Sequence, residues 1–411
     1  MKQDGGKLWT LAQAPEGPLA EYLDLFARHL DGQGFNRRGL GQQIRTAARF
    51  SRWLQTKDIA AALVTDEHAR RFLGEPAQQG FVVQGAAAIL RRLIDFLRRL
   101  GIFSVPPTSD ALTPVEQVIA AYAGHLQKDQ GLSGNTLLQY CPFAKAFLVK
   151  HFGTGLVDLS ILRALDVIEF VQQQAAHLSP ARAKASTIAL RSFLRYLRYC
   201  GGTRLDLASS VPTVPNWSMT AIPRAIAPDH LRAVLAGCRR DKSVGRRDYA
   251  ILMLLARLGL RSSEVVSLTL DSVGWEDGSI AILGKGNHPA ILPLPVEVGE
   301  AIAEYLQWGR PVCDSRALFL RASAPIRGLG SQTTVGTIVG AAIRRAGVQT
   351  RYRGSHQFRH ALAADMLRNG STLTEIGSLL RHRHPKTTGI YAKVDFEALR
   401  PLSQSWPGDA Q

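Results

Sequence analysis

Four separated fragments of the chain carry side chains that could act together on a phosphate group. The fragments are GLRSSE (259–264), GKG (284–286), HQFRH (356–360) and LLRHRHPKTTGIY (379–391). Their candidate reactive residues are Arg261, Glu264, Lys285, His356, Arg359, His382 and Tyr391. Guanidinium groups bind phosphate oxygens with paired donors, and a tyrosine hydroxyl becomes a nucleophile once its surroundings or a base activate it. These residue types therefore indicate phosphoryl transfer through a covalent intermediate.

Each of these residues, taken alone, has an ordinary structural interpretation. Arg261 can be a cation at a helix end, Lys285 a turn residue and Tyr391 a packed ring. His356 and His360 are four residues apart, but the glutamate of an HExxH motif is absent and no third ligand is evident. We therefore expect no metal site. The order and spacing of the whole set favour the catalytic interpretation.

The ordered set resembles the catalytic signature of the tyrosine recombinases, the integrase and Xer-like family. The resemblance covers about residues 110–395. His382 lies nine residues before Tyr391, which is the spacing in that family. The chain departs from the family pattern where Arg381 replaces a glycine, where Leu258 replaces a threonine and where His384 is an additional histidine. None of these departures removes a chemical group.

The resemblance implies a role for each residue that would bind the phosphate. Arg261 and Arg359 correspond to the two arginines of the family and would clamp the non-bridging oxygens, over which charge spreads in the transition state. His382 would donate a further hydrogen bond to the same group. Glu264 corresponds to the supporting acidic residue and would orient Arg261 rather than react.

The resemblance also implies how the bond is broken. Tyr391 would attack phosphorus to form a 3′-phosphotyrosyl bond and release a 5′-hydroxyl. Its hydroxyl has a free pKa of about 10, so it needs activation, and His356 could take the proton. Lys285 would protonate the leaving oxygen. The bond energy is kept, so we expect no cofactor, no ATP and no metal ion.

The elements that must position these residues are predicted mainly from apolar periodicity. In the C-terminal part, GLRSSE is expected to end a helix and the segment 279–295 reads as a β-hairpin closed by GKGNH. The predicted helices are 228–238, 247–259, 298–307, 332–346, 357–369, 372–380 and 384–391. The pattern predicts a mixed α+β catalytic domain with a small antiparallel sheet.

Proline-rich stretches divide the chain into three predicted domains, 1–105, 110–210 and 220–411. The first two read as helical, and LRRLIDFLRRLG (90–101) parallels LRSFLRYLRYCG (190–201). We therefore predict a multidomain protein with a duplicated pair of helical bundles. By the family resemblance, these would be DNA-binding bundles of the core-binding (SAM-like) type.

The charge of the chain indicates a polyanionic partner. Its 411 residues include 50 Lys and Arg against 33 Asp and Glu, a net charge of +17. Such an excess favours nucleic acid, with a membrane surface or an acidic protein as the alternatives. The four cysteines lack metal-ligand or redox spacing, and neither a signal peptide nor a membrane-spanning stretch is apparent. We expect a cytoplasmic, nucleoid-associated bacterial protein.

The resemblance implies site-specific recombination: integration, excision, resolution or transposition of a mobile element. In the family, four protomers act on two double-stranded DNA sites, so a homotetrameric synapse is expected, with sister recombinases as further partners. The segment 395–408 could dock on a neighbouring protomer. Two alternatives stay open: a type IB topoisomerase with the same chemistry, and a non-catalytic DNA-binding relative.

Overall fold

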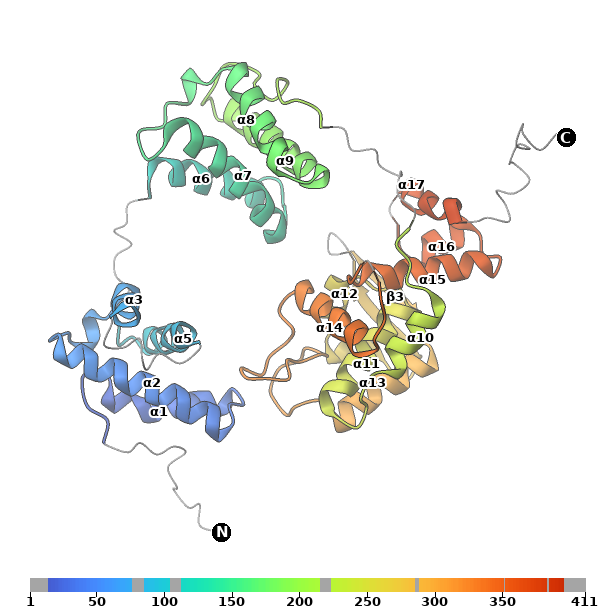
Figure 1. Ribbon diagram of the computed structural model, residues 1–411, viewed down its shortest axis with the longest axis horizontal. Helices are drawn as coiled ribbons and strands as arrows, with labels where there is room; N and C mark the ends of the chain where they lie inside the picture. Colours follow the sequence, from blue (N-terminus) through green and yellow to red (C-terminus); the bar gives the residue numbers. More distant parts are fainter. Residues whose placement is uncertain are drawn as a thin grey trace, which may run out of the picture. The chain divides into compact units, whose positions relative to one another are not determined.

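The computed structural model describes residues 14–75, 85–103, 112–214, 223–284, 288–350, 352–382 and 384–394. By its internal contacts, the chain divides into two compact units. One is Pro107–Ala221, and the other combines Met1–Pro106 with Ile222–Gln411. Both units are mostly helical (Figure 1). Lys285 and the segment 395–408 lie outside the described residues.

The N-terminal part is a helical bundle with its own core. Its helices are α1 (Leu23–Gly32), α2 (Arg37–Thr56), α3 (Asp66–Gly74) and α5 (Ala86–Arg99). The apolar periodicity of α5 produces one buried face, which contains the fully buried residues Leu90, Leu93, Ile94 and Leu97. Phe50 and Trp53 of α2 complete this core with a stacked ring pair.

The unit Pro107–Ala221 is a second helical bundle. Its helices are α6 (Pro114–Lys128), α7 (Gly134–Phe152), α8 (Ala164–His177) and α9 (Pro180–Tyr199). Both α6 and α9 begin with proline, whose fixed φ suits the first helical position. Leu190, Phe193 and Leu194 of α9 are buried in a separate core. The duplication of the two bundles stays a prediction.

The remaining part carries the small sheet and the candidate site. Its helices are α10 (Pro228–Ala236), α11 (Ser243–Arg257), α12 (Ser262–Ser267), α13 (Val296–Trp308), α14 (Gln332–Arg345), α15 (His356–Arg368), α16 (Leu373–Leu379) and α17 (Pro385–Thr388). Helix α11 is the centre of its core, with residues 250–256 buried without interruption, and it packs against α13, α14 and α15.

The sheet has three antiparallel strands in the order β1-β2-β3. They are β1 (Val273–Gly274), β2 (Ser279–Leu283) and β3 (Pro289–Pro293). The predicted hairpin is confirmed, with Ile280 opposite Leu292. Alternation places Ile280 and Ile282 of β2 on the buried face. The two-residue strand β1 was not predicted, because so short a segment has no period to detect.

Two local predictions were wrong. GLRSSE does not end a helix: α11 stops at Arg257, and Arg261 is the N-cap of the next helix, α12. Between them Gly259 has a φ of 56°, which glycine adopts without strain and which breaks the helix. The helix expected over 384–391 is shorter, because α17 ends at Thr388 and a 3-10 segment follows over Gly389–Val394.

None of the helices in the described segments combines the length and the apolar character that a membrane span requires.

Candidate active site

Arg261 and Glu264 lie together at the start of α12. The carboxylate of Glu264 accepts a hydrogen bond from the Arg261 backbone N–H at 2.8 Å and binds the guanidinium Nη1 at 2.7 Å. Glu264 is fully buried, while the side chain of Arg261 is partly exposed. A buried carboxylate thus holds both the backbone and the side chain of Arg261, which fixes the direction of its guanidinium group.

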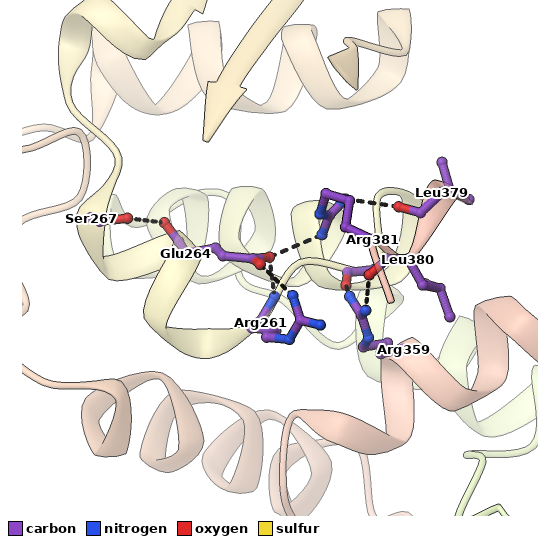
Figure 2. Close-up of polar contacts among 8 residues, drawn as sticks. Arg261, Glu264, Ser267, Arg359, Leu379, Leu380 and Arg381 are labelled. Carbon is purple, nitrogen blue, oxygen red and sulfur yellow. Dashed lines mark hydrogen bonds and ion pairs between the residues drawn. The ribbon is translucent and has the colours of Figure 1, made fainter. Parts of the chain in front are cut away.

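Arg359 is the second arginine of the site and is 4% exposed. It lies in the first turn of α15, and its guanidinium donates to the backbone carbonyl of Gly259. It also donates to the backbone carbonyl of Leu380 (Figure 2). Burial, followed by the charges of Arg261 and Arg381, lowers the pKa of Arg359 to about 9. A guanidinium has five N–H donors, so these two contacts leave others for a ligand.

Tyr391 lies in the 3-10 segment after α17 and is 1% exposed. Its ring belongs to a small core with Ala363, Ile376 and Leu380. Burial raises the pKa of Tyr391 to about 12, although the charges of Arg359 and Arg261 act in the opposite direction. The candidate nucleophile is therefore protonated at neutral pH in this arrangement.

The hydroxyl of Tyr391 is paired with His360, at 2.9 Å from Nδ1. In the tautomer that carries its proton on Nε2, His360 accepts this hydrogen bond. Burial, with the charges of His356 and Arg359, lowers the pKa of His360 to about 4, so the ring is neutral at pH 7. From the sequence, His360 was interpreted only as one of two residues at zinc-ligand spacing, and its contact with Tyr391 was not predicted. The signal was its position next to Arg359 in HQFRH.

His382 is a second histidine whose ring lies near that of Tyr391. Its imidazole is nearly parallel to Tyr391, with an interplanar angle of 7° and ring centroids 6.4 Å apart. Its Nδ1 is 2.8 Å from the hydroxyl of Thr388. Burial, followed by the charge of Arg359, lowers the pKa of His382 to about 4. The contact with Thr388 fixes the ring and leaves Nε2 for a ligand.

Of the two remaining candidates, His356 lies within the described residues and Lys285 does not. His356 is the first residue of α15 and is exposed, and desolvation together with the charges of Arg359 and Arg261 lowers its pKa. The hydroxyl of Tyr391 is hydrogen-bonded to His360 rather than to His356. Lys285 is outside the described residues, and its neighbour Gly284 borders the cleft described next.

A cleft of about 620 Å³ opens between the hairpin and the turn that follows α16. Its walls include Arg261 and Arg381, with His382 beside them and His288 on the hairpin side. Its two guanidinium groups make it a positively charged recess suited to an anion such as a phosphodiester. Among the described residues, no group of histidine, cysteine and acidic side chains is arranged to hold a metal ion.

Arg381 was noted in the sequence only as a departure from the family pattern. In the structure its Nη2 binds the second carboxylate oxygen of Glu264 at 2.9 Å, so that Glu264 lies between the guanidinium groups of Arg261 and Arg381 (Figure 2). Its backbone has a φ of 55°, in the left-handed region.

Comparisons with known proteins agree with this geometry. The sequence profile of the phage integrase family matches residues 224–398. The chain is 46% identical to the y4rA integrase/recombinase of Sinorhizobium fredii (strain NBRC 101917 / NGR234), over 98% of each chain. It is 30% identical to the tyrosine recombinase XerD of Mycobacterium tuberculosis (strain CDC 1551 / Oshkosh), over 71% of this chain and 96% of that protein.

Solved structures share the fold. The XerH site-specific recombinase in its post-cleavage complex with a palindromic difH substrate aligns with a TM-score of 0.55 and 18% identity, over 72% of this chain and 98% of XerH. The Tn1549 transposon integrase in complex with a circular intermediate DNA aligns with a TM-score of 0.51 and 16% identity, over 70% and 99%. From the site, the sequence relatives and the fold, we conclude that the chain belongs to the tyrosine recombinase family of DNA-cleaving and DNA-rejoining enzymes.

Proposed function

We propose that this chain is a site-specific DNA recombinase that cuts and rejoins double-stranded DNA through a 3′-phosphotyrosyl intermediate. The observation that carries the proposal is the convergence of Tyr391 with Arg261 and Arg359. These residues come from three separate elements, yet both arginines lie near enough for their charges to lower the pKa of the tyrosine against the effect of burial. This is the arrangement that attack on a phosphodiester requires.

In the proposed reaction, the scissile phosphate enters the cleft between the hairpin and the turn after α16. Arg261 binds one non-bridging oxygen from the wall of the cleft, and the remaining N–H donors of Arg359 bind the phosphate as well. His382 donates from Nε2. These donors stabilise the charge that develops on the non-bridging oxygens as the bond breaks.

The chemical step exchanges one phosphodiester bond for another. The tyrosine oxygen forms a bond to phosphorus, the bond from phosphorus to the 5′-oxygen breaks, and the 5′-oxygen takes up a proton that we assign to Lys285. The proton of Tyr391 passes to a histidine, for which His360 and His356 are the candidates. Attack by a 5′-hydroxyl on the phosphotyrosine then reverses these events on the same or another strand, with no net consumption of energy.

The histidines become better bases when DNA is bound. Their pKa values are lowered in the unliganded protein by burial and by neighbouring arginines. A phosphate in the cleft neutralises part of that positive charge and therefore raises the histidine pKa values. Substrate binding and proton acceptance are coupled in this proposal, which limits attack by Tyr391 in the absence of DNA.

The proposed partners are recombination sites in double-stranded DNA and further copies of the chain, with four protomers in the active synapse and sister recombinases as additional members. The Tn1549 structure contains a transposon integrase with a circular DNA intermediate, which supports a role in a mobile element. We propose domains at 1–105, 110–210 and 220–411, each of which has a hydrophobic core of its own. Segment 110–210 and the catalytic domain would grip the DNA together.

A covalent trap tests the function. The full-length protein and its Tyr391→Phe variant are incubated with sheared genomic DNA from the organism that encodes the chain, and DNA that stays attached after denaturation is recovered and sequenced. The Phe variant keeps the buried ring and removes only the hydroxyl. We expect adducts with the wild type alone, clustered at one sequence.

Other outcomes contradict the proposal in different ways. Tyrosine-dependent adducts scattered over the DNA would indicate a topoisomerase. Tight DNA binding without any adduct would indicate a non-catalytic relative. Adducts that persist in the Tyr391→Phe variant would assign the nucleophile to another residue.

A further inference from the structure

Arg381 has a backbone conformation and a buried polar atom that are both unfavourable for an arginine. Its φ of 55° lies in a region where a side chain is strained and glycine is not. Its Nε is buried and has no hydrogen-bond partner among the described residues. Both features destabilise the folded chain. Such a residue is retained where its side chain serves the site, and the contacts of Arg381 lead directly to it.

The first of these contacts concerns the charge of Arg261. Glu264 binds Arg261 through Oε1 at 2.7 Å and Arg381 through Oε2 at 2.9 Å. One buried carboxylate therefore lies between two guanidinium groups, and the three groups together carry a net positive charge. Without Arg381, the carboxylate would neutralise Arg261 alone. Arg381 thus leaves Arg261 with positive charge for a phosphate.

The second contact concerns the place of His382. The N–H of Arg381 donates to Ser378 and the N–H of His382 donates to Gly377, which is the hydrogen-bond pattern of a Schellman motif at the end of α16. In that motif the residue with positive φ is Arg381, and the next residue is His382. Because its side chain reaches Glu264 at the start of α12, Arg381 ties the turn that carries His382 to the helix that carries Arg261.

We propose that Arg381 is a positioning residue for strand cleavage, which acts through Glu264 to keep Arg261 charged and aligned and which fixes His382 in register with it. This inference rests on the proposed recombinase function and adds to it a residue that shapes the phosphate cleft. Arg381 itself lines that cleft beside Arg261 and His382.

The test compares Arg381→Gly and Arg381→Lys with the wild type. Glycine relieves the backbone strain, so the variant is expected to fold at least as well, which thermal melting checks. Asp58→Gly is the matched control, because Asp58 is the other non-glycine residue with positive φ in the described part of the chain, at 53°. It lies in the N-terminal bundle and is not among the residues that line the cleft.

With the DNA fragment recovered by the covalent trap, we expect Arg381→Gly to lower the single-turnover cleavage rate about 30-fold, while the KM for DNA changes less than threefold. Arg381→Lys should recover part of the rate, because it restores a charge but not the forked donor. Asp58→Gly should cleave as the wild type does. A wild-type rate for Arg381→Gly would overturn the inference while leaving the proposed function intact.

A double-mutant cycle tests whether Arg381 acts through Glu264. In a Glu264→Gln background there is no carboxylate charge to share, so adding Arg381→Gly should lower the rate no more than about threefold. An undiminished 30-fold loss in that background would show that Arg381 acts elsewhere, and would overturn the inference.

A measurement without catalysis separates this inference from the proposed function. Inorganic phosphate is titrated into ¹⁵N-histidine-labelled protein, with the His382 signal identified by its loss in His382→Asn. We expect the phosphate Kd to rise at least threefold in Arg381→Gly and to stay unchanged in Asp58→Gly. Equal phosphate affinities would overturn the role of Arg381 even in a protein that cleaves DNA, and failure of the wild type to cleave would affect only the proposed function.

Discussion

Tyr391 shows how burial and charge compete at one residue. With a pKa of about 12, only about one hydroxyl in 10⁵ is ionised at pH 7. The arginines lower the pKa but do not overcome desolvation. Ionisation before attack is therefore a minor route, and the proton must leave during the attack itself, which gives the adjacent histidines their importance.

The low pKa of His360 leads to a prediction about how the free energy of unfolding depends on pH. The pKa of His360 is about 4 in the folded protein and about 6.5 in an unfolded chain. Between these values the unfolded state binds the proton and the folded state does not. The contribution of His360 to the free energy of unfolding is therefore fully present at pH 7 and is lost as the pH falls towards 4. It amounts to about 1–2 kcal/mol between pH 7 and pH 5.

His360→Gln removes the titrating group and keeps a polar side chain for the tyrosine hydroxyl. Urea unfolding at pH 7 and at pH 5 should show that the stability advantage of the wild type over the variant shrinks by about 1–2 kcal/mol at the lower pH. His68→Gln, at a histidine with ordinary local contacts in the N-terminal bundle, is the control. An advantage that does not change with pH would show that His360 titrates normally.

At the residue scale, most of the candidate site could be predicted. The types and order of Arg261, Arg359 and Tyr391 sufficed, and the structure brings these residues together. The partner of the tyrosine hydroxyl could not be predicted. His356 and His360 are one helical turn apart, and the choice between them depends on where the segment Gly389–Val394 packs, which leaves no local pattern in the sequence.

At the scale of elements, the site depends on helix ends rather than helix centres. Arg261 is an N-cap, Arg359 lies in a first turn, and His382 follows a C-cap. Backbone groups at helix ends lack partners within the helix, so they bind side chains and ligands. This explains why α16, only seven residues long, is important: it holds the turn that carries Arg381 and His382.

The capping box of α16 gives a prediction at this scale. The hydroxyl of Thr372 accepts from the N–H of Glu375 at 3.2 Å, and the Glu375 carboxylate accepts from the N–H of Thr372 at 2.7 Å. Thr372→Ala should destabilise α16 by about 1 kcal/mol. Hydrogen exchange at the amides of residues 379–382 should then accelerate about fivefold.

The control for that experiment is Thr113→Ala, which removes a capping box of the same type from α6 in the other compact unit. Exchange at residues 379–382 should not change in this variant. If Thr372→Ala leaves their exchange at the wild-type rate as well, the turn is held by Glu264 and not by the helix.

Elements with a clear apolar periodicity could be predicted from the sequence. Elements whose boundaries depend on the conformation of a single residue could not. The hairpin was predicted because two apolar runs flank a polar turn, and its strands pair as expected. Helix α12 was missed because six residues are too few for a period. The break before it depends on the positive φ of Gly259, whose missing Cβ leaves room for the side chains of Leu380 and Leu362.

At the scale of the whole molecule, the three domains at 1–105, 110–210 and 220–411 stay a prediction. The described residues of each segment contain a hydrophobic core, and those of 220–411 contain a second, smaller one around Tyr391. The grouping of Met1–Pro106 with Ile222–Gln411 in one compact unit was not predictable. Contacts between segments that are distant in the sequence do not alter composition or periodicity in either segment, so single-sequence patterns cannot show them.

The exposed arginines of helix α2 lead to a prediction that the N-terminal bundle contacts DNA. Helix α2 contains no acidic residue, and its exposed Arg38 and Arg45 lie seven residues apart on one face. If α2 contacts DNA phosphates, the double variant Arg38→Gln/Arg45→Gln should reduce the slope of log Kd against log salt by about 2. Equilibrium binding to a DNA fragment carrying the trapped sequence, from 50 to 300 mM salt, measures it.

The matched control removes the same charge elsewhere. Arg232 and Arg239 are exposed, and each pairs with a neighbouring aspartate, so Arg232→Gln/Arg239→Gln should leave the slope unchanged. If the α2 variant also keeps the wild-type slope, α2 does not bind phosphate, and contact with another protein becomes the role we propose for this helix.

The place of Tyr391 in a small core has a consequence for how such a chain can diverge. The ring fills space against Ile376 and Leu380, so a small residue at this position would open a cavity next to the turn that carries His382. Loss of the hydroxyl and loss of the ring are therefore separate evolutionary events. A descendant that gives up strand cleavage but still occupies its DNA sites should pass first through phenylalanine at 391, and an aromatic ring without a hydroxyl there would mark a lineage turning from enzyme to repressor.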